Sequence, residues 1–114
     1  MKSEDAVDMF SALAHADRLT IISQLVAAGP KGMAAGDIAA AVGASASRAS
    51  FHLSALHAAG ILQRQREARV LRYSVDFARI GALMTWLMRD CCKNSPELRA
   101  CCGLGAGSAS CTCG

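Results

Sequence analysis

The stretch that most constrains the fold runs from a short helix, through a glycine-containing turn, into a second helix, over residues 35–60. In the first helix, Ile38 and Val42 fall on one side. Gly43 follows where a tight turn needs a residue of positive φ. In the second helix, expected over residues 45–59, small and apolar side chains recur at helical spacing: Ala46, Ala49, Leu53 and Leu56. This order is typical of a helix-turn-helix.

The first two turns of that second helix carry mostly small polar side chains. They carry short hydroxyls, one arginine and one histidine: Ser45, Ser47, Arg48, Ser50 and His52. Small side chains let a backbone approach DNA closely, and an arginine can bind a guanine edge through two hydrogen bonds. The set therefore suits the major groove of DNA. Over this stretch alone, an ordinary amphipathic surface helix with a serine N-cap is the alternative.

A pair of short strands follows the second helix. Leu71, Tyr73 and Val75 alternate with polar residues, which is the period of a strand, and a turn is expected at residues 67–69. Residues 45–74 hold five arginines and one glutamate, a net charge of +4, whereas the whole chain carries +3. A basic hairpin beside such a helix is typical of a nucleic-acid interface, and a solvated basic hairpin is the alternative.

Three further helices complete the predicted domain, at residues 4–13, 16–28 and 77–92. Each has an apolar stripe, which we expect to face inward or to contact a second subunit. The order ααααββα predicts a mainly α fold with a small β-hairpin, a winged helix-turn-helix, over residues 1–92. Residues 93–114 are rich in glycine, small residues and cysteine, and are predicted to form a flexible tail with one turn of helix at most.

Length and composition limit the other possibilities. A chain of 114 residues with 53% hydrophobic residues and few aromatics predicts one small domain, which often buries further apolar surface by dimerising. No apolar run approaches the roughly 18 residues of a membrane span. Residues 1–10 are acidic and lack the apolar region of a signal peptide, so a cytoplasmic location is predicted.

All six cysteines fall in the last part of the chain: Cys91, Cys92, Cys101, Cys102, Cys111 and Cys113. Without a secretory signal, reduced thiols are the default, so metal binding or redox sensing outranks a disulfide framework. We expect Arg89, Lys93 and Arg99, which are near in sequence, to favour the thiolate forms. No phosphate-binding loop, Cys-x-x-Cys motif in a βαβ unit or nucleophile–base pair is present, so no enzymatic activity is predicted.

The element order and three stretches resemble the ArsR/SmtB family of metal-sensing repressors: LAHADRLTIISQL, GDIAAAVGASASRASFHLSALHAAGIL and RQREARVLRYSV. The resemblance implies a homodimer, paired through its first and last helices, that binds double-stranded operator DNA. By the same resemblance the major groove is faced by Ser47, Arg48, Ser50 and His52. The wing arginines are Arg66, Arg69 and Arg72.

The sensor sites of that family are only partly matched. Residues 34–37, Ala-Ala-Gly-Asp, stand where the founding arsenic sensors carry Cys-x-Cys-Asp, and residues 77–90 lack the histidines of the zinc sensors. The remaining thiols are Cys91 and Cys92 with Cys101 and Cys102. They resemble a branch of the family in which a vicinal cysteine pair and a downstream cysteine bind trivalent arsenic.

Thiolate chemistry agrees with that implication. All-thiolate sites select thiophilic ions, and arsenite or antimonite takes three sulfurs in a pyramid, whereas zinc takes four in a tetrahedron. The sequence therefore predicts a repressor that arsenite, antimonite or methylarsenite releases from its operator, with no organic cofactor. A zinc- or cadmium-responsive repressor and a thiol-redox repressor remain alternatives. A metalloid chaperone that uses the tail, including Cys111 and Cys113, is the alternative from another class.

Overall fold

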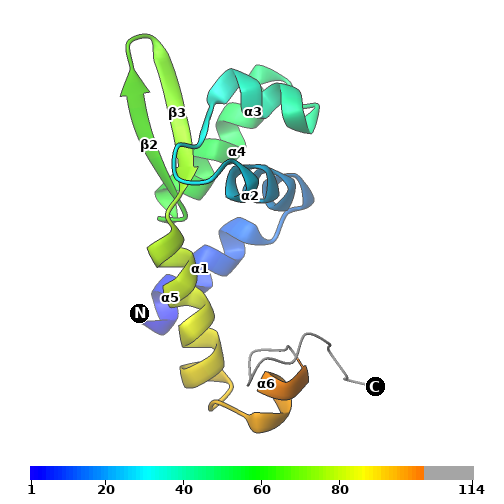
Figure 1. The fold of residues 1–114 in the computed structure, drawn as a ribbon, viewed down its shortest axis with the longest axis vertical. Coiled ribbons are helices and arrows are strands. Elements are labelled where there is room, and N and C mark those ends of the chain that lie inside the picture. The colour runs from blue at the N-terminus through cyan, green and yellow to red at the C-terminus, as the bar shows by residue number, and fades with distance from the viewer. Residues whose placement is uncertain (102–114) are drawn as a thin grey trace. The chain divides into compact units, whose positions relative to one another are not determined.

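The computed structural model describes residues 1–101, so Cys102, Cys111 and Cys113 lie outside the described residues. The described residues form two compact units, one of Met1–Ile80 and one that begins at Gly81. Figure 1 shows the elements of both. The division falls inside the helix expected at residues 77–92, and not after it. The first unit contains the helix-turn-helix and the hairpin, and the second contains the cysteines.

Four helices and a three-stranded sheet build the first unit, in the predicted order. The helices are α1 (Ser3–Leu13), α2 (Ala16–Ala28), α3 (Ala35–Val42) and α4 (Ala46–Ala58). The prediction of a mainly helical, winged helix-turn-helix fold is confirmed, and the hairpin stands beside α3 and α4 (Figure 1).

The turn between α3 and α4 has the geometry that the sequence indicates. Gly43 ends α3 in the left-handed region, with φ of 67°, and the backbone N–H of Ala44 donates to Ala39 O over 3.0 Å. Ser45 caps α4, because its Oγ accepts a hydrogen bond from the N–H of Arg48 over 3.2 Å. Glycine and serine thus fix the angle at which α4 leaves the turn.

The sheet is antiparallel in the order β1-β3-β2, with β1 at Met33–Ala34, β2 at Leu62–Glu67 and β3 at Val70–Val75. The sequence analysis missed β1 and expected a connector there, because a strand of two residues has no period to detect. A two-residue loop joins β2 to β3, and Ala68 in it has φ of 56°, a conformation that a non-glycine residue adopts at some cost.

The core of the first unit lies between the helices and the inner face of the sheet. Its fully buried large side chains are Met9, Ile21, Leu25, Ile38, Leu53, Leu56 and Ile61. On α4, Ala49, Leu53 and Leu56 are buried as predicted and so is Ile38 on α3, whereas Ala46 of the predicted stripe is exposed. On α1 the buried residues are Ala6, Met9 and Ala12, and Val7, which helical spacing places on the predicted apolar stripe, is 58% exposed. On α2 the buried residues are Ile21 and Leu25, and Leu19, on the predicted stripe of that helix, is 54% exposed.

In the second unit the last helix differs from the expected single helix at residues 77–92. α5 (Phe77–Trp86) starts in the first unit and gives way to a π-helical turn, η1 (Leu87–Cys91), in which the N–H of Cys92 donates to Leu87 O over 3.0 Å. α6 (Pro96–Cys101) follows, slightly longer than the single turn expected there. None of the helices within residues 1–101 has the length and apolar character needed to span a membrane.

Candidate nucleic-acid interface and thiol pair

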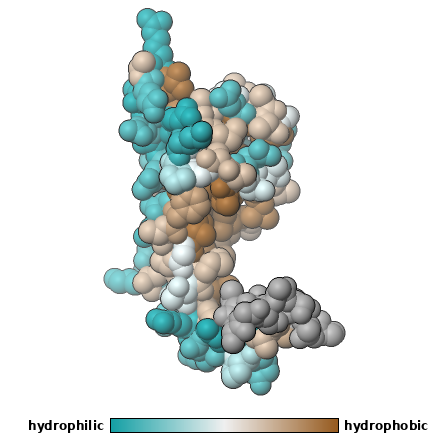
Figure 2. Space-filling view, in the orientation of Figure 1, coloured by the Kyte–Doolittle hydropathy of each residue, from teal (hydrophilic) through white to brown (hydrophobic). Residues whose placement is uncertain are grey.

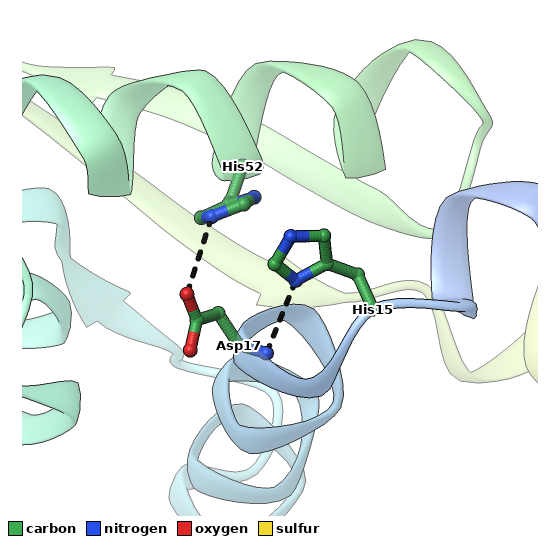
Figure 3. Close-up of side chains that lie close together, drawn as sticks. All are labelled: His15, Asp17 and His52. Carbon is green, nitrogen blue, oxygen red and sulfur yellow. Dashed lines mark hydrogen bonds and ion pairs between the residues drawn. The ribbon is translucent and has the colours of Figure 1, made fainter.

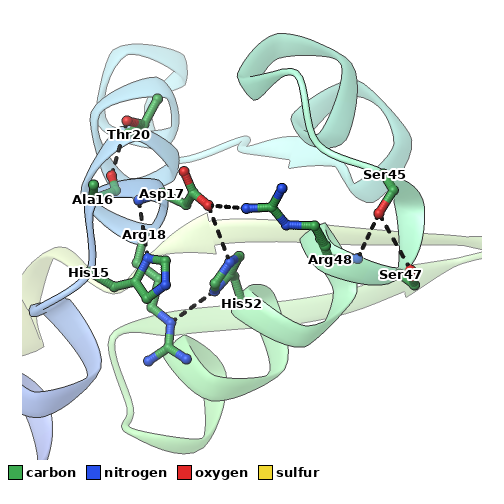
Figure 4. Close-up of polar contacts among 9 residues, drawn as sticks. All are labelled: His15, Ala16, Asp17, Arg18, Thr20, Ser45, Ser47, Arg48 and His52. Carbon is green, nitrogen blue, oxygen red and sulfur yellow. Dashed lines mark hydrogen bonds and ion pairs between the residues drawn. The ribbon is translucent and has the colours of Figure 1, made fainter.

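α4 presents a hydroxyl-rich outer face. Ala49, Leu53 and Leu56 anchor the helix in the core, which leaves Ser47 and Ser50 exposed. Ser45 is also exposed, but its Oγ is engaged as the helix cap and lies 3.4 Å from the Oγ of Ser47 (Figure 4). The two serines within the helix are therefore available to an approaching surface, and Ser45 acts through the backbone.

Arg48 extends from α4 and is held by α2. Its Nη2 donates to Oδ2 of Asp17 over 2.7 Å, and the two side chains are 64% and 40% exposed (Figure 4). Such an exposed pair contributes little to stability, but it fixes the direction of the guanidinium. The arginine predicted to face DNA thus already has an anionic partner within the chain.

His52 corrects the prediction that it faces the major groove, because the residue is only 5% exposed. It lies three residues after buried Ala49 and next to buried Leu53, on the inner side of the helix. Its Nδ1 accepts a hydrogen bond from Nε of Arg18 over 3.1 Å (Figure 4), and its Nε2 lies 3.6 Å from Oδ2 of Asp17 (Figure 3). His52 therefore joins α4 to α2 and offers no edge to DNA.

The surroundings of His52 keep its ring neutral. Burial lowers its pKa below 6.5, and electrostatic interactions with His15, Arg18 and Arg48 lower it further, while Asp17 acts in the opposite direction. The ring centroids of His15 and His52 are 4.6 Å apart. A charged imidazolium at this place would stand among other cations.

His15, Asp17 and His52 place possible metal-ligand atoms within 4.8 Å of one another. The hydrogen bonds argue against a metal ion there. Because Nδ1 of His52 accepts from Arg18, the neutral ring carries its proton on Nε2, and that nitrogen has no lone pair for a metal. Arg48 also occupies the carboxylate of Asp17. We interpret the cluster as a hydrogen-bond network that fixes α4 against α2.

The arginines of the wing, which is the hairpin formed by β2 and β3, have two different environments. Arg66 and Arg69 are exposed at the end of the hairpin, whose surface is hydrophilic (Figure 2). Arg72 was expected beside them, but it is half-buried: its Nε donates to Lys31 O over 2.9 Å and its Nη2 to Gly32 O over 3.5 Å. Arg72 lies opposite Ala34 in the sheet, so its side chain reaches the loop before β1. It ties the hairpin to the unit.

The thiol pair lies in the second unit. Cys91, at the end of η1, is exposed, and Cys92 is half-buried; both are free thiols. Burial, a hydrogen bond with Cys91 and the charge of Cys91 raise the pKa of Cys92, opposite to the lowering expected from the nearby cations. Cys101 ends α6, and residues 1–101 show no ligand group formed by these three cysteines together. The predicted ligand Cys102 lies outside the described residues.

Comparisons with known proteins agree with this geometry. A family model described as a helix-turn-helix domain matches residues 13–65. The HTH-type transcriptional regulator YgaV of Escherichia coli is 31% identical over 90 residues, which are 79% of this chain and 89% of YgaV. The crystal structure of NolR from Sinorhizobium fredii is 33% identical and superposes with a TM-score of 0.61 over 76% of this chain and 84% of NolR.

A solution structure from Mycobacterium bovis is also similar. It is the homodimeric winged helix-turn-helix DNA-binding domain of Mb0332, a possible ArsR-family transcriptional regulator. It is 29% identical, with a TM-score of 0.61 over 82% of this chain and 86% of that domain. This chain belongs to the ArsR-like family of helix-turn-helix transcriptional regulators. The relatives are transcriptional regulators and not enzymes, as the sequence analysis predicted for this chain.

Sequence reasoning missed three residues of this ArsR-like regulator. Asp17 and Arg18 lie 31 and 34 residues before their partners Arg48 and His52, so no local spacing links them. Asp17 also lies in the first turn of α2, where a negative charge is favourable, so its sequence position has a local explanation without any partner. Phe51 is 66% exposed on α4, and its signal was available, because it falls one helical turn after Ser47.

Proposed function

We propose that this ArsR-like regulator is a homodimeric repressor of a two-fold symmetric operator, and that trivalent arsenic bound by Cys91 and Cys92 releases it. The choice of arsenic as the inducer rests on the pair of adjacent, free thiols at the end of η1. Support for DNA binding comes from the outer face of α4 and from exposed Arg66 and Arg69. Support for the homodimer comes from the homodimeric relative Mb0332.

The raised pKa of Cys92 is compatible with arsenous acid as the ligand. Each As–S bond replaces an As–O bond, and the thiol proton leaves with the hydroxyl as water. Thiols can therefore enter the reaction protonated, and the raised pKa of Cys92 does not oppose it. Cys91 and Cys92 supply two sulfurs, and a cysteine further along the chain supplies the third; Cys101 is disulfide-bonded in this structure, so it would have to be reduced before it could bind. Methylarsenite needs the vicinal pair alone.

A redox switch between the two adjacent thiols is the weaker candidate. Neighbouring Cα atoms are about 3.8 Å apart, below the roughly 4.4–6.8 Å that disulfides usually span. Thiol–disulfide exchange also needs a thiolate, and the raised pKa of Cys92 disfavours it. A zinc site would need four ligands held in a tetrahedron, and the structure shows only two free thiols within residues 1–101. These arguments favour the metalloid.

The proposal is allosteric, because the thiols and the DNA-contacting residues are separate. Cys91 and Cys92 follow α5 in the chain, and the DNA residues lie on α4 and the hairpin. A coupling free energy of about 1–3 kcal/mol would lower operator affinity roughly 5–150-fold. By reciprocity, operator DNA would lower the affinity for arsenic by the same factor.

The experiment uses an operator selected in vitro with the full chain. Fluorescence anisotropy of the labelled duplex, with and without arsenite, gives the dissociation constants. We expect arsenite to weaken binding of the wild type by roughly 5–150-fold. Cys91→Ser and Cys92→Ser should each bind the operator with the affinity of the wild type, and arsenite should not change that affinity. Cys111→Ser with Cys113→Ser is the matched control and should still respond.

Each result of that experiment has one meaning. If arsenite does not change the operator affinity of the wild type, arsenite is not the inducer. If Cys91→Ser or Cys92→Ser responds to arsenite normally, that cysteine is not a ligand. A response to a thiol oxidant but not to arsenite would establish the redox repressor. X-ray absorption of the loaded protein should show sulfur ligands around arsenic, three for arsenite.

A further inference from the structure

Phe51 is an apolar side chain in an unexpected place. It is 66% exposed, more than any other large apolar side chain within residues 1–101. It lies on the face of α4 that also carries Ser47, Ser50 and Ser54, while the opposite face packs into the core. Burial of a phenylalanine side chain is favourable, so we expect a bound partner to contact the ring of Phe51 and to cover it.

The ring of Phe51 is supported and not loosely placed. The guanidinium carbon of Arg18 lies 5.6 Å from the ring centroid, and the ring of His52 meets it edge-on at 5.5 Å. Arg18 is itself fixed by hydrogen bonds to Nδ1 of His52 and to Ala12 O. The same network that buries His52 therefore braces the ring.

The charge around Phe51 indicates which class of molecule binds this face of α4. α4 contains no aspartate or glutamate, Arg18 of α2 lies against the ring of Phe51, and Arg48 lies in the first turn of α4, where it pairs with Asp17. A polyanion is the complementary surface. Base edges in the major groove are polar except at thymine, whose C5-methyl group is the apolar feature that a phenylalanine can contact. We propose that Phe51 is a specificity-determining residue that contacts a thymine methyl group in each operator half-site.

This inference rests on DNA binding through α4, one part of the proposed function, and is independent of the inducer. The test replaces single thymines of the selected operator by deoxyuridine, which removes the methyl group alone. For the wild type, one position per half-site should weaken binding about fourfold, the effect of one methyl-sized group. Phe51→Ala should bind the thymine and uracil duplexes equally at that position.

The controls separate the possible failures. Ser54→Ala, one turn further along the same face, should keep the fourfold preference for thymine. If Phe51→Ala keeps it too, Phe51 is not the contact. If the wild type prefers thymine at no position, the inference fails without any variant. If the wild type selects no duplex at all, DNA binding itself fails. Anisotropy measures all three proteins, and their thermal unfolding curves should coincide.

Discussion

At the scale of single residues, Asp17 connects two helices. One oxygen of its carboxylate accepts from Arg48 and faces His52, both on α4. Arg18, the next residue, donates to the other nitrogen of His52. Two consecutive residues at the start of α2 therefore set the position of a histidine, an arginine and an aromatic ring on α4.

The lowered pKa of His52 predicts how stability depends on pH. The unfolded chain takes up the proton near pH 6.5, whereas the folded chain does so only at lower pH. The contribution is complete above pH 6.5 and is lost as the pH falls from there toward the folded-state pKa. We expect the free energy of unfolding, measured with urea, to decrease over that range.

His52→Gln supplies the comparison for that prediction. The glutamine oxygen can accept from Arg18 and does not titrate. The free energy of unfolding of the variant should therefore fall less steeply below pH 6.5 than that of the wild type. Parallel curves for the two proteins would show that His52 does not titrate differently in the folded and unfolded states.

At the scale of elements, the hairpin combines an anchored base with an exposed end. Arg72 is bonded to two backbone carbonyls of the loop before β1, and Arg66 is exposed on β2. We expect Arg72→Ala to lower the free energy of unfolding by about 1 kcal/mol, because two acceptors lose a charged donor. Arg66→Ala should change it by less than about 0.5 kcal/mol.

The same two variants should differ on DNA. If Arg66 contacts a phosphate, Arg66→Ala reduces the slope of log affinity against log salt by about 0.9 per lost contact. Arg72→Ala should retain the slope of the wild type at a temperature where it is folded. Chemical denaturation and anisotropy over a salt series provide the two measurements. Equal losses of stability in both variants would contradict the division of roles.

Periodicity predicted the elements well where they are long. The helix-turn-helix and the hairpin follow from Gly43, Ser45 and the alternation at residues 71–75. The strand β1 was missed because its hydrogen bonds to β3 come from tertiary pairing. The stripes of α1 and α2 were right only in part, since Ala6 and Leu25 are buried whereas Val7 and Leu19 are exposed. Such helices carry apolar residues on several sides, and only packing decides which side is buried. The π turn likewise left no sequence signal.

For the candidate site too, the sequence predicted what depends on local spacing and missed what depends on partners from other elements. The exposure of Ser47, Arg48 and Ser50 followed from helical spacing, since their positions are set by residues on their own helix. The burial of His52 and the engagement of Arg72 depend on partners from α2 and from the loop before β1. Such partners are set by the fold, so a local pattern cannot reveal them.

At the scale of the whole molecule, the exposed apolar side chains predict the subunit contact. Val7 on α1 is 58% exposed, and the resemblance to ArsR/SmtB repressors pairs subunits through the first and last helices. We expect Val7→Glu to leave the fold intact and to weaken the dimer roughly tenfold or more, because each copy would bury an unpaired carboxylate. Sedimentation velocity over a concentration series measures this change.

Leu19→Glu is the matched control for the dimer. Leu19 is 54% exposed, close to the value for Val7, but it lies on α2. It should keep the association of the wild type. If Leu19→Glu dissociates the protein and Val7→Glu does not, the subunits pair through a different surface.

The pair of Asp17 and Arg48 has a consequence for the search along a genome. In the free protein the carboxylate occupies the guanidinium much as a nucleic acid would, so contact with DNA through Arg48 is an exchange of partners. Random sequence that offers only a loose contact gains little from that exchange. A guanine in the right place offers two acceptors and more than compensates. If Arg48 contacts DNA, the small cost of leaving Asp17 is subtracted from every site alike, so a loose contact on random sequence loses most of its gain and a guanine bound through two hydrogen bonds keeps part of its own.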